Sequence, residues 1–346
     1  MRDILDLSLE DLSSYVVENG YKPYKAKQIY SWLYKKRISD PDMMSDLSKE
    51  LITRLKEDFY FENLKLVTKQ VAKDKTTKFL FELVDGNFIE SVLMVFDYGY
   101  SACISTQVGC NMGCRFCASG LLRKVRDLSV GEILGQVLYI QKYLDLTQER
   151  LANIVVMGTG EPFDNYDNLM AALKIINDPL GLEIGARHIS ISTCGIVPKI
   201  LQFADESVQY NLAISLHASN DELRSKLMPI NKAYPLKELF KALKEYSLKN
   251  KRRITLEYLL LDGVNDKESN ADELKDLLRG QNAYINLIPY NNVDERDFRS
   301  VSERKALDFY DMLKKRGISV TLRQKKGDDI DAACGQLRAK KMKEER

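Results

Sequence analysis

The chain has 346 residues and a hydrophobic content of 45%, which is enough to bury the core of one large domain or of two ordinary ones. Its 52 Lys and Arg side chains against 50 Asp and Glu give a net charge of only +2. This balance leaves nucleic-acid binding open, because a basic face can be offset by acids elsewhere. No apolar signal-peptide segment opens the chain, and no run approaches the about 18 apolar residues of a membrane span. We therefore expect a cytoplasmic protein with no membrane contact.

Residues 1–72 predict a small helical domain. Apolar side chains recur at helical spacing in three stretches, 11–17, 24–36 and 48–59. Six Lys and Arg residues gather between Lys22 and Arg37, in a stretch that contains no Asp or Glu. The sequence leaves two interpretations of this domain open, a packing unit and an accessory domain that contacts RNA.

Residues 73–101 contain two strand-like runs, 78–84 and 88–96. Asp85-Gly86-Asn87 separates them, and this tripeptide is typical of a tight turn between paired strands. We therefore predict a β-hairpin that links the helical domain to the rest of the chain.

From residue 102 to 326, strand-like runs alternate with helix-like runs. Strands separated by helices pair in parallel through right-handed crossovers, so we predict an α/β fold with a partial (β/α)6-type barrel. In such barrels the chemistry lies on the loops after the carboxyl ends of the strands. Residues 327–346 form a C-terminal loop and a polar, mostly basic tail. The predicted strands are 102–106, 153–157, 188–193, 210–216, 253–261, 284–289 and 318–323, and the helices include 129–143, 166–177, 236–249, 270–279 and 302–315.

Cys110, Cys114 and Cys117 form a C-x3-C-x2-C motif directly after the first predicted strand. Cysteines in a reducing cytosol do not predict a disulfide framework. A structural zinc ion prefers four ligands, and the sequence lacks a second C-x2-C unit to complete such a site. A 4Fe-4S cluster held by three thiolates keeps one iron open, where S-adenosylmethionine (SAM) can bind through its amino and carboxylate groups.

This motif, with an aromatic residue before its last cysteine, is similar to the signature of the radical SAM superfamily. Within that superfamily, further segments resemble one family, the dual-specificity 23S rRNA and tRNA adenine C2 methyltransferases known as RlmN. The resemblance runs in order from about residue 20 to 337 and implies a barrel of the radical SAM kind. One departure is Thr159, where many relatives carry Met. The segments are 105–110, 156–162, 191–198, 212–218, 226–231, 260–265, 286–291 and 327–336.

Several residues fall at the predicted carboxyl ends of the strands. Gly158 and Gly160 allow a ligand to approach the backbone closely, and Glu161 can accept a hydrogen bond from the amino group of SAM. Small polar residues after other strands suit either a ligand or ordinary turn and core hydrogen bonds. His188 has no support beyond a structural role, and we assign no role to Cys194. The resemblance implies that SAM contacts Gly160, Glu161, Ser192, Ser215, Leu216, His217 and Asn291.

Cys334 lies far from the cysteine motif, and a lone cysteine is usually a small buried hydrophobe. Its neighbouring glycines and acids instead suggest a thiol on a movable loop. Carbon 2 of adenine is a poor nucleophile, because it is bonded between two ring nitrogens, so a radical route suits its methylation. The resemblance implies that one SAM methylates Cys334 and that a second yields a 5′-deoxyadenosyl radical, which activates this methyl group. It also implies that Glu90 takes the C2 proton and that Cys103 forms a transient disulfide with Cys334.

The implied partners are 23S rRNA, tRNA and a one-electron reductant such as flavodoxin or ferredoxin. Three alternatives stay open. The nearest is the sibling methylation of adenine C8, which confers antibiotic resistance, although Glu161-Pro162 and residues 193–198 look more like the C2 enzymes. The others are an RNA-binding module with a vestigial cluster and a zinc-binding structural protein.

Overall fold

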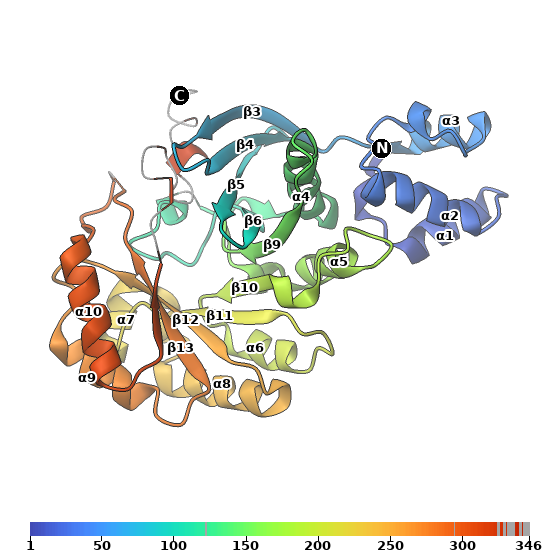
Figure 1. Cartoon of the computed structure of the whole chain (residues 1–346). Coiled ribbons are helices and arrows are strands. Elements are labelled where there is room, and N and C mark those ends of the chain that lie inside the picture. The colour runs from blue at the N-terminus through green and yellow to red at the C-terminus, as the bar shows by residue number, and fades with distance from the viewer. Residues whose placement is uncertain are drawn as a thin grey trace.

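The computed structural model describes residues 1–121, 123–293, 295–323, 326, 327, 330, 336–338 and 341. A small group of N-terminal helices lies beside a long curved sheet, and the remaining helices cover the outer side of that sheet (Figure 1). Within the described ranges, no helix is both long and apolar enough to cross a membrane.

The N-terminal part contains the three predicted helical stretches. α1 (Leu9–Glu18) begins at Ser8, which forms a capping box with Asp11. α2 (Tyr24–Tyr30) continues into a π-helical turn, η2 (Ser31–Lys35), and α3 (Lys49–Asp58) begins at Ser48. The hydrophobic core of these helices is continuous with that of the barrel, so the two parts pack as one body.

Ten strands form one continuous sheet in the order β14-β13-β12-β11-β10-β9-β6-β5-β4-β3. The strands from β6 and β9 to β14 are parallel, as predicted, and β3 to β6 pair antiparallel. The α/β partial barrel is thus confirmed, and the predicted hairpin extends its sheet. The bounds are β3 (Leu64–Val71), β4 (Thr77–Leu83), β5 (Phe88–Phe96), β6 (Gly99–Cys103), β9 (Leu151–Val156), β10 (Ile189–Thr193), β11 (Asn211–Ser215), β12 (Ile254–Leu260), β13 (Ala283–Pro289) and β14 (Val320–Leu322).

Two sequence predictions need correction in this sheet. Residues 64–71 were assigned to the helical domain, yet they form β3, an edge strand without fully buried residues that pairs with β4. The first barrel strand was predicted at 102–106, but β6 starts at Gly99 because it pairs with both β5 and β9. Its earlier end leaves residues 104–106 in the loop at the carboxyl edge of the sheet.

Helices alternate with the parallel strands along the chain. Two of them, α6 and α7, are short and were not among the predicted helices. The bounds are α4 (Val130–Asp145), α5 (Tyr166–Asn177), α6 (Val197–Ala204), α7 (Asp221–Leu227), α8 (Leu236–Asn250), α9 (Glu268–Leu277) and α10 (Glu303–Lys315).

Polar contacts join the N-terminal segment to the first turn of α4. Asp3 accepts hydrogen bonds from Leu5 N at 2.9 Å and from Asn63 Nδ2 at 2.5 Å. Gly131 N donates to Asp6 Oδ1 at 2.7 Å, and the lack of a side chain at Gly131 leaves room for the Asp3 carboxyl group. Burial raises the pKa of Asp3 to about 7.

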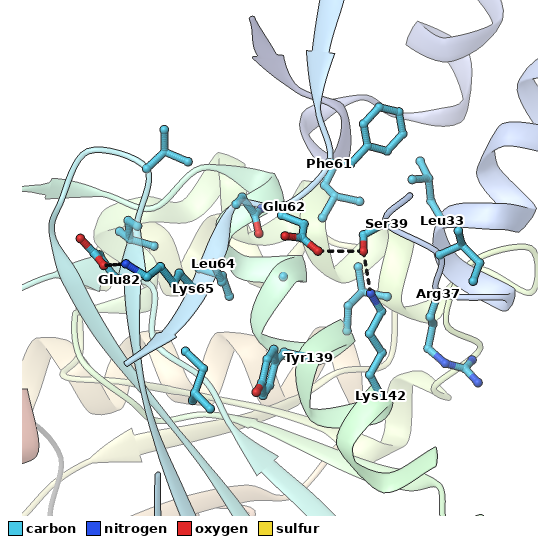
Figure 2. A pocket seen from close by; sticks show the side chains of 18 residues that line it. Leu33, Arg37, Ser39, Phe61, Glu62, Leu64, Lys65, Glu82, Tyr139 and Lys142 are labelled. Carbon is cyan, nitrogen blue, oxygen red and sulfur yellow. Dashed lines mark hydrogen bonds and ion pairs between the residues drawn. The ribbon is translucent and has the colours of Figure 1, made fainter. Parts of the chain in front are cut away.

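A pocket of about 660 Å³ lies at the junction between the N-terminal helices, β3, β4 and α4. Figure 2 shows Ser39 between Glu62 and Lys142, at 3.1 and 3.3 Å, with Leu33 and Tyr139 nearby. None of the residues predicted to bind a cofactor or to act in catalysis lines this pocket. The residues predicted to bind SAM lie instead at the carboxyl edge of the parallel strands.

Candidate active site

The cysteine motif lies in a loop whose two ends are paired. β7 (Gln107–Val108) runs antiparallel to β8 (Arg126–Asp127), immediately before and after the loop. Arg126 forms ion pairs with Glu132 in the first turn of α4 and with Asp85 in the hairpin turn, at 2.7 and 2.6 Å. Hydrogen bonding to this guanidinium holds the pKa of Asp85 at about 2. The loop is thereby anchored to the hairpin and to the barrel.

The three cysteines predicted as cluster ligands are half-buried neighbours in this loop. Burial raises the pKa of the Cys110 thiol to about 11, and the nearby Cys117 adds to the rise. Burial likewise raises the pKa of Cys114 well above its ordinary value, again with help from the other two thiols. Such thiols ionise readily only beside positive charge, which bound iron supplies. The arrangement therefore suits metal-bound thiolates better than free ones.

Among the described residues, no three His, Cys, Asp or Glu side chains converge as ligands of a single metal ion would. A 4Fe-4S cube binds each thiolate at a different iron, so its cysteine sulfurs are held apart from one another.

Residues from distant parts of the barrel hold the backbone of the loop. Tyr290 Oη donates to the carbonyl of Phe116 at 2.9 Å, and the Arg296 guanidinium donates to the carbonyl of Cys117 at 2.9 Å. The ring of His217 contacts Phe116 edge to face, with centroids 4.9 Å apart. These contacts fix the position of the last two cysteines.

Gly158 and Gly160 follow β9 where the chain passes close to the start of the cluster loop. A Cβ atom at Gly158 would lie 2.6 Å from the carbonyl oxygen of Ile104. At Gly160, where φ is +114°, it would lie 2.7 Å from Cβ of Gln107 and 2.8 Å from Oγ1 of Thr106. Both positions require glycine because backbone and side chains of the 104–107 segment occupy the space.

Glu161 joins the ends of two strands. Its carboxylate accepts from Cys194 N after β10 at 2.8 Å and from Phe163 N at 3.0 Å. The side chain is buried, and burial raises its pKa above the ordinary value. A cationic ligand amino group would find here a carboxylate that protein donors already orient.

A row of polar side chains crosses the barrel strands. The hydroxyls of Ser192 on β10 and Ser215 on β11 lie 3.4 Å apart, and Ser215 is the register partner of Glu257 on β12. Glu257 accepts from Asn286 Nδ2 on β13 at 2.9 Å. It is buried, which raises its pKa to about 7. Glu257 and Asn286 were not among the predicted site residues. In the sequence, each is a polar residue inside a mostly apolar strand.

The remaining predicted SAM contacts follow β11 and β13. Leu216 is fully buried and its N–H donates to the carbonyl of Glu257. His217 adopts a positive φ of 56°, and its Nδ1 accepts from Leu259 N at 3.1 Å. Burial lowers the pKa of His217 to about 3, so the ring is neutral. Asn291 is partly exposed two residues after β13.

Arg224 on α7 is a buried cation that the sequence analysis missed. Its guanidinium donates to the carbonyls of Cys194 and Ser215, at 2.7 and 3.3 Å, and to Asn231 Oδ1 at 2.9 Å. It therefore holds the ends of β10 and β11 together beside the cluster loop. Nothing in its local sequence distinguishes it from an ordinary exposed helix arginine.

Glu90 and Cys103 lie on neighbouring strands next to the cluster loop. Val92, two residues beyond Glu90 on β5, is the register partner of Cys103 on β6, so the three side chains share one face of the sheet. Both Glu90 and Cys103 are buried. Cys334, the predicted methyl carrier, lies outside the described residues.

His188 and Cys194, to which no role was assigned, lie at opposite ends of β10. His188 is exposed at the amino end of β10, where its Nδ1 lies 2.9 Å from Asn153 Oδ1. Cys194 is buried directly after the carboxyl end of β10, and its backbone N–H donates to Glu161. Only His188 therefore lies away from the candidate site.

Two family models match the chain, the radical SAM superfamily over residues 104–274 and the ribosomal RNA large subunit methyltransferase N-terminal domain over residues 2–60. The chain is 53% identical to a probable dual-specificity RNA methyltransferase RlmN of Bacillus licheniformis, with 99% of this chain and 95% of that protein covered. It is also 53% identical to a protein of the same name from Thermoanaerobacter sp., covering 99% and 100%.

A crystal structure of a radical SAM methyltransferase from Sphaerobacter thermophilus superimposes with a TM-score of 0.94 at 42% identity. The superposition covers 97% of this chain and 99% of that one. The similarity therefore spans the N-terminal helices, the extended sheet and the barrel together.

Proposed function

This chain belongs to the RlmN family of RNA methyltransferases within the radical SAM superfamily, and we propose that it methylates C2 of adenine in 23S rRNA and in the tRNA anticodon loop. One observation carries the proposal beyond the superfamily. A buried glutamate and a buried cysteine share one face of neighbouring strands beside the cluster loop. A radical SAM protein that only cleaved SAM would not need this pair.

The radical SAM family implies a 4Fe-4S cluster and SAM as cofactors. We assign one cluster to Cys110, Cys114 and Cys117, and SAM to residues at the carboxyl edge of the parallel strands. A cluster held by these three cysteines would supply one-electron chemistry, both the electron that cleaves SAM and an acceptor for the electron that the RNA adduct loses. Two SAM molecules are consumed in each turnover, one as methyl donor and one as radical source. The proposed SAM positions are Gly160, Glu161, Ser192, Ser215, Leu216, His217 and Asn291.

The protein's own residues act on the methyl carrier and the adenine. Cys334 carries the methyl group that becomes bonded to C2. Glu90 then takes the C2 proton, and the Cys103 thiolate attacks the sulfur of Cys334. This attack forms the disulfide and breaks the bond between sulfur and the transferred carbon, which keeps the electron pair of that bond. With a proton from solvent, this carbon becomes the methyl group on C2. The target adenine must leave its stack to reach the barrel mouth.

The proposed partners are 23S rRNA, tRNA and a one-electron reductant such as flavodoxin or ferredoxin. RNA substrates of this kind place the reaction in the cytoplasm. The sibling activity at adenine C8 is the alternative outcome. Digestion of the modified RNA and chromatography against 2-methyladenosine and 8-methyladenosine standards separates the two.

Cys103→Ala tests the proposed chemistry. This variant should methylate Cys334 and add to RNA but fail to release it, because no second thiol attacks the sulfur. A protein–RNA adduct that survives denaturation and collapses on ribonuclease treatment is the expected product. Cys194→Ser, a buried thiol replaced by a hydroxyl, is the control and should turn over. Normal turnover by Cys103→Ala would contradict the disulfide step.

A further inference from the structure

A fully buried lysine faces Glu90. Lys78 on β4 has no exposed surface, and its Nζ lies 3.0 Å from Oε2 of Glu90, whose side chain is 3% exposed. Removing two charges from water costs several kcal/mol per ion unless the pair is well arranged, so such a pair is weak evidence of stability alone. Its position suggests a functional reason.

The sheet register places this pair in the candidate active site. Val92 is the register partner of Lys78 on one side and of Cys103 on the other. Glu90 precedes Val92 by two residues, so it shares their face and is the diagonal neighbour of Lys78. Lys78, Glu90 and Cys103 therefore belong to one face across β4, β5 and β6.

The second carboxylate oxygen of Glu90 is held by the C-terminal segment. The backbone N–H of Arg338 donates to Oε1 at 2.6 Å, and Arg338 follows Cys334 by four residues. The charged or titratable groups that contact Glu90, or that the register places on its face, include Lys78 from β4, Cys103 from β6 and Arg338. Arg323, after β14, donates to Met94 Sδ on the same strand as Glu90.

We propose that Lys78 is a positioning residue for the proton transfer, orienting the Glu90 carboxylate through their buried ion pair, opposite the Arg338 N–H. The inference rests on the proposed role of Glu90. In the step concerned, the C2–H bond breaks, the proton goes to a Glu90 oxygen, and the electron pair of the bond stays in the adenine ring. A carboxylate this deeply buried favours its neutral form unless a cation faces it, and a neutral carboxyl group cannot accept the proton.

Lys78→Met tests this assignment through the pH dependence of adduct release. At neutral pH the variant should release the RNA adduct at least about tenfold more slowly. It should still contain the cluster and methylate Cys334, and its release should be slowed less at higher pH. Lys78→Arg, which keeps the cation, should restore release at neutral pH. Glu90→Gln should accumulate adduct at every pH.

Lys65→Met is the matched control. Lys65 also pairs with a glutamate across neighbouring strands, with Nζ 2.9 Å from Glu82 Oε2, but it is 79% exposed and lies away from Cys103. Its loss should leave adduct release and the pH profile unchanged. If Lys78→Met protein lacks its visible cluster absorption, Lys78→Gln replaces it, because glutamine hydrogen-bonds to Glu90 without a charge.

The outcomes separate the two levels of the proposal. Wild-type release and an unshifted pH profile in the uncharged Lys78 variants would overturn the role of Lys78 and leave the methyltransferase function standing. Normal turnover by Glu90→Gln would instead remove Glu90 as the base, and with it the proposed function's proton step.

Discussion

At the scale of single residues, the active site requires a position without a side chain next to a carboxylate with a fixed orientation. Gly160 carries no side chain because Gln107 and Thr106 fill the space where one would lie. Glu161 next to it has its carboxylate oriented by two backbone N–H groups. The glycine therefore brings the end of β9 against the start of the cluster loop, and the glutamate connects it to β10.

Gly160→Ala should abolish SAM binding, because the added Cβ would separate the 158–161 segment from the cluster loop. Gly86→Ala is a matched control: Gly86 also has a positive φ, of 80°, but no atom within 4 Å of the added Cβ. It should cost only the backbone strain of about 1–2 kcal/mol and leave SAM binding unchanged. Equilibrium dialysis with SAM and thermal unfolding distinguish the two, and equal SAM affinity in both variants would refute the steric argument.

At the scale of secondary-structure elements, α4 joins the N-terminal helices to the barrel. In its first turn, the Gly131 N–H donates a hydrogen bond to Asp6. The nearby Asp3 is buried and accepts a hydrogen bond from Asn63. Further along α4, Asp145 forms an ion pair with Arg37 at 2.7 Å. α4 thus contacts both the N-terminal helices and Arg126 at the end of the cluster loop.

Asp3 should make this junction pH-dependent. Its pKa in the folded protein is about 7 against an ordinary value of 3.8, because burial disfavours the charge. Between these two values the folded state binds more protons than the unfolded state, so the free energy of unfolding falls as pH rises from about 4 to about 7. Asp3→Asn should weaken this fall. Thermal unfolding across that range measures it, and an unchanged pH slope would argue against a buried neutral Asp3.

At the scale of the whole molecule, the cations between Lys22 and Arg37 differ in what they contact. Arg37 and Lys35 are ion-paired with Asp145 and Glu183, so they hold the N-terminal helices on the barrel. Lys22 is exposed just before α2, and Lys27 is exposed within α2. The sequence does not distinguish the ion-paired cations from the solvent-exposed ones, because spacing alone does not reveal the partner of a side chain.

Lys22→Glu with Lys27→Glu should weaken RNA binding at low salt and reduce the steepness of its salt dependence, by about one unit of the logarithmic slope per lost phosphate contact. Lys244→Glu, with Lys241→Glu, on the exposed side of α8 is the control with equal charge change. Titrations of an rRNA fragment at several salt concentrations measure both. Equal affinity and slope in the two double variants would place the RNA elsewhere.

The sequence alone determined the features that depend on local spacing. The alternation of strand-like and helix-like runs predicted the parallel barrel, which the structure confirms. The C-x3-C-x2-C spacing and the ordered family segments predicted the superfamily and the family, which known relatives confirm. The edge strand β3 escaped prediction because none of its residues is fully buried and its apolar residues alternate only irregularly with polar ones.

Only the tertiary structure decided which polar side chains are buried and what each of them faces. Lys78 directly precedes the apolar run Phe79-Leu80-Phe81 in β4, and nothing in its neighbours shows that it pairs with Glu90. The Arg338 N–H reaches the same carboxylate across 248 positions of sequence. Arg224 likewise bonds to carbonyls at the ends of two strands. A buried charge is stabilised by partners that the fold brings together, so its role is set by the register of strands and the path of the chain.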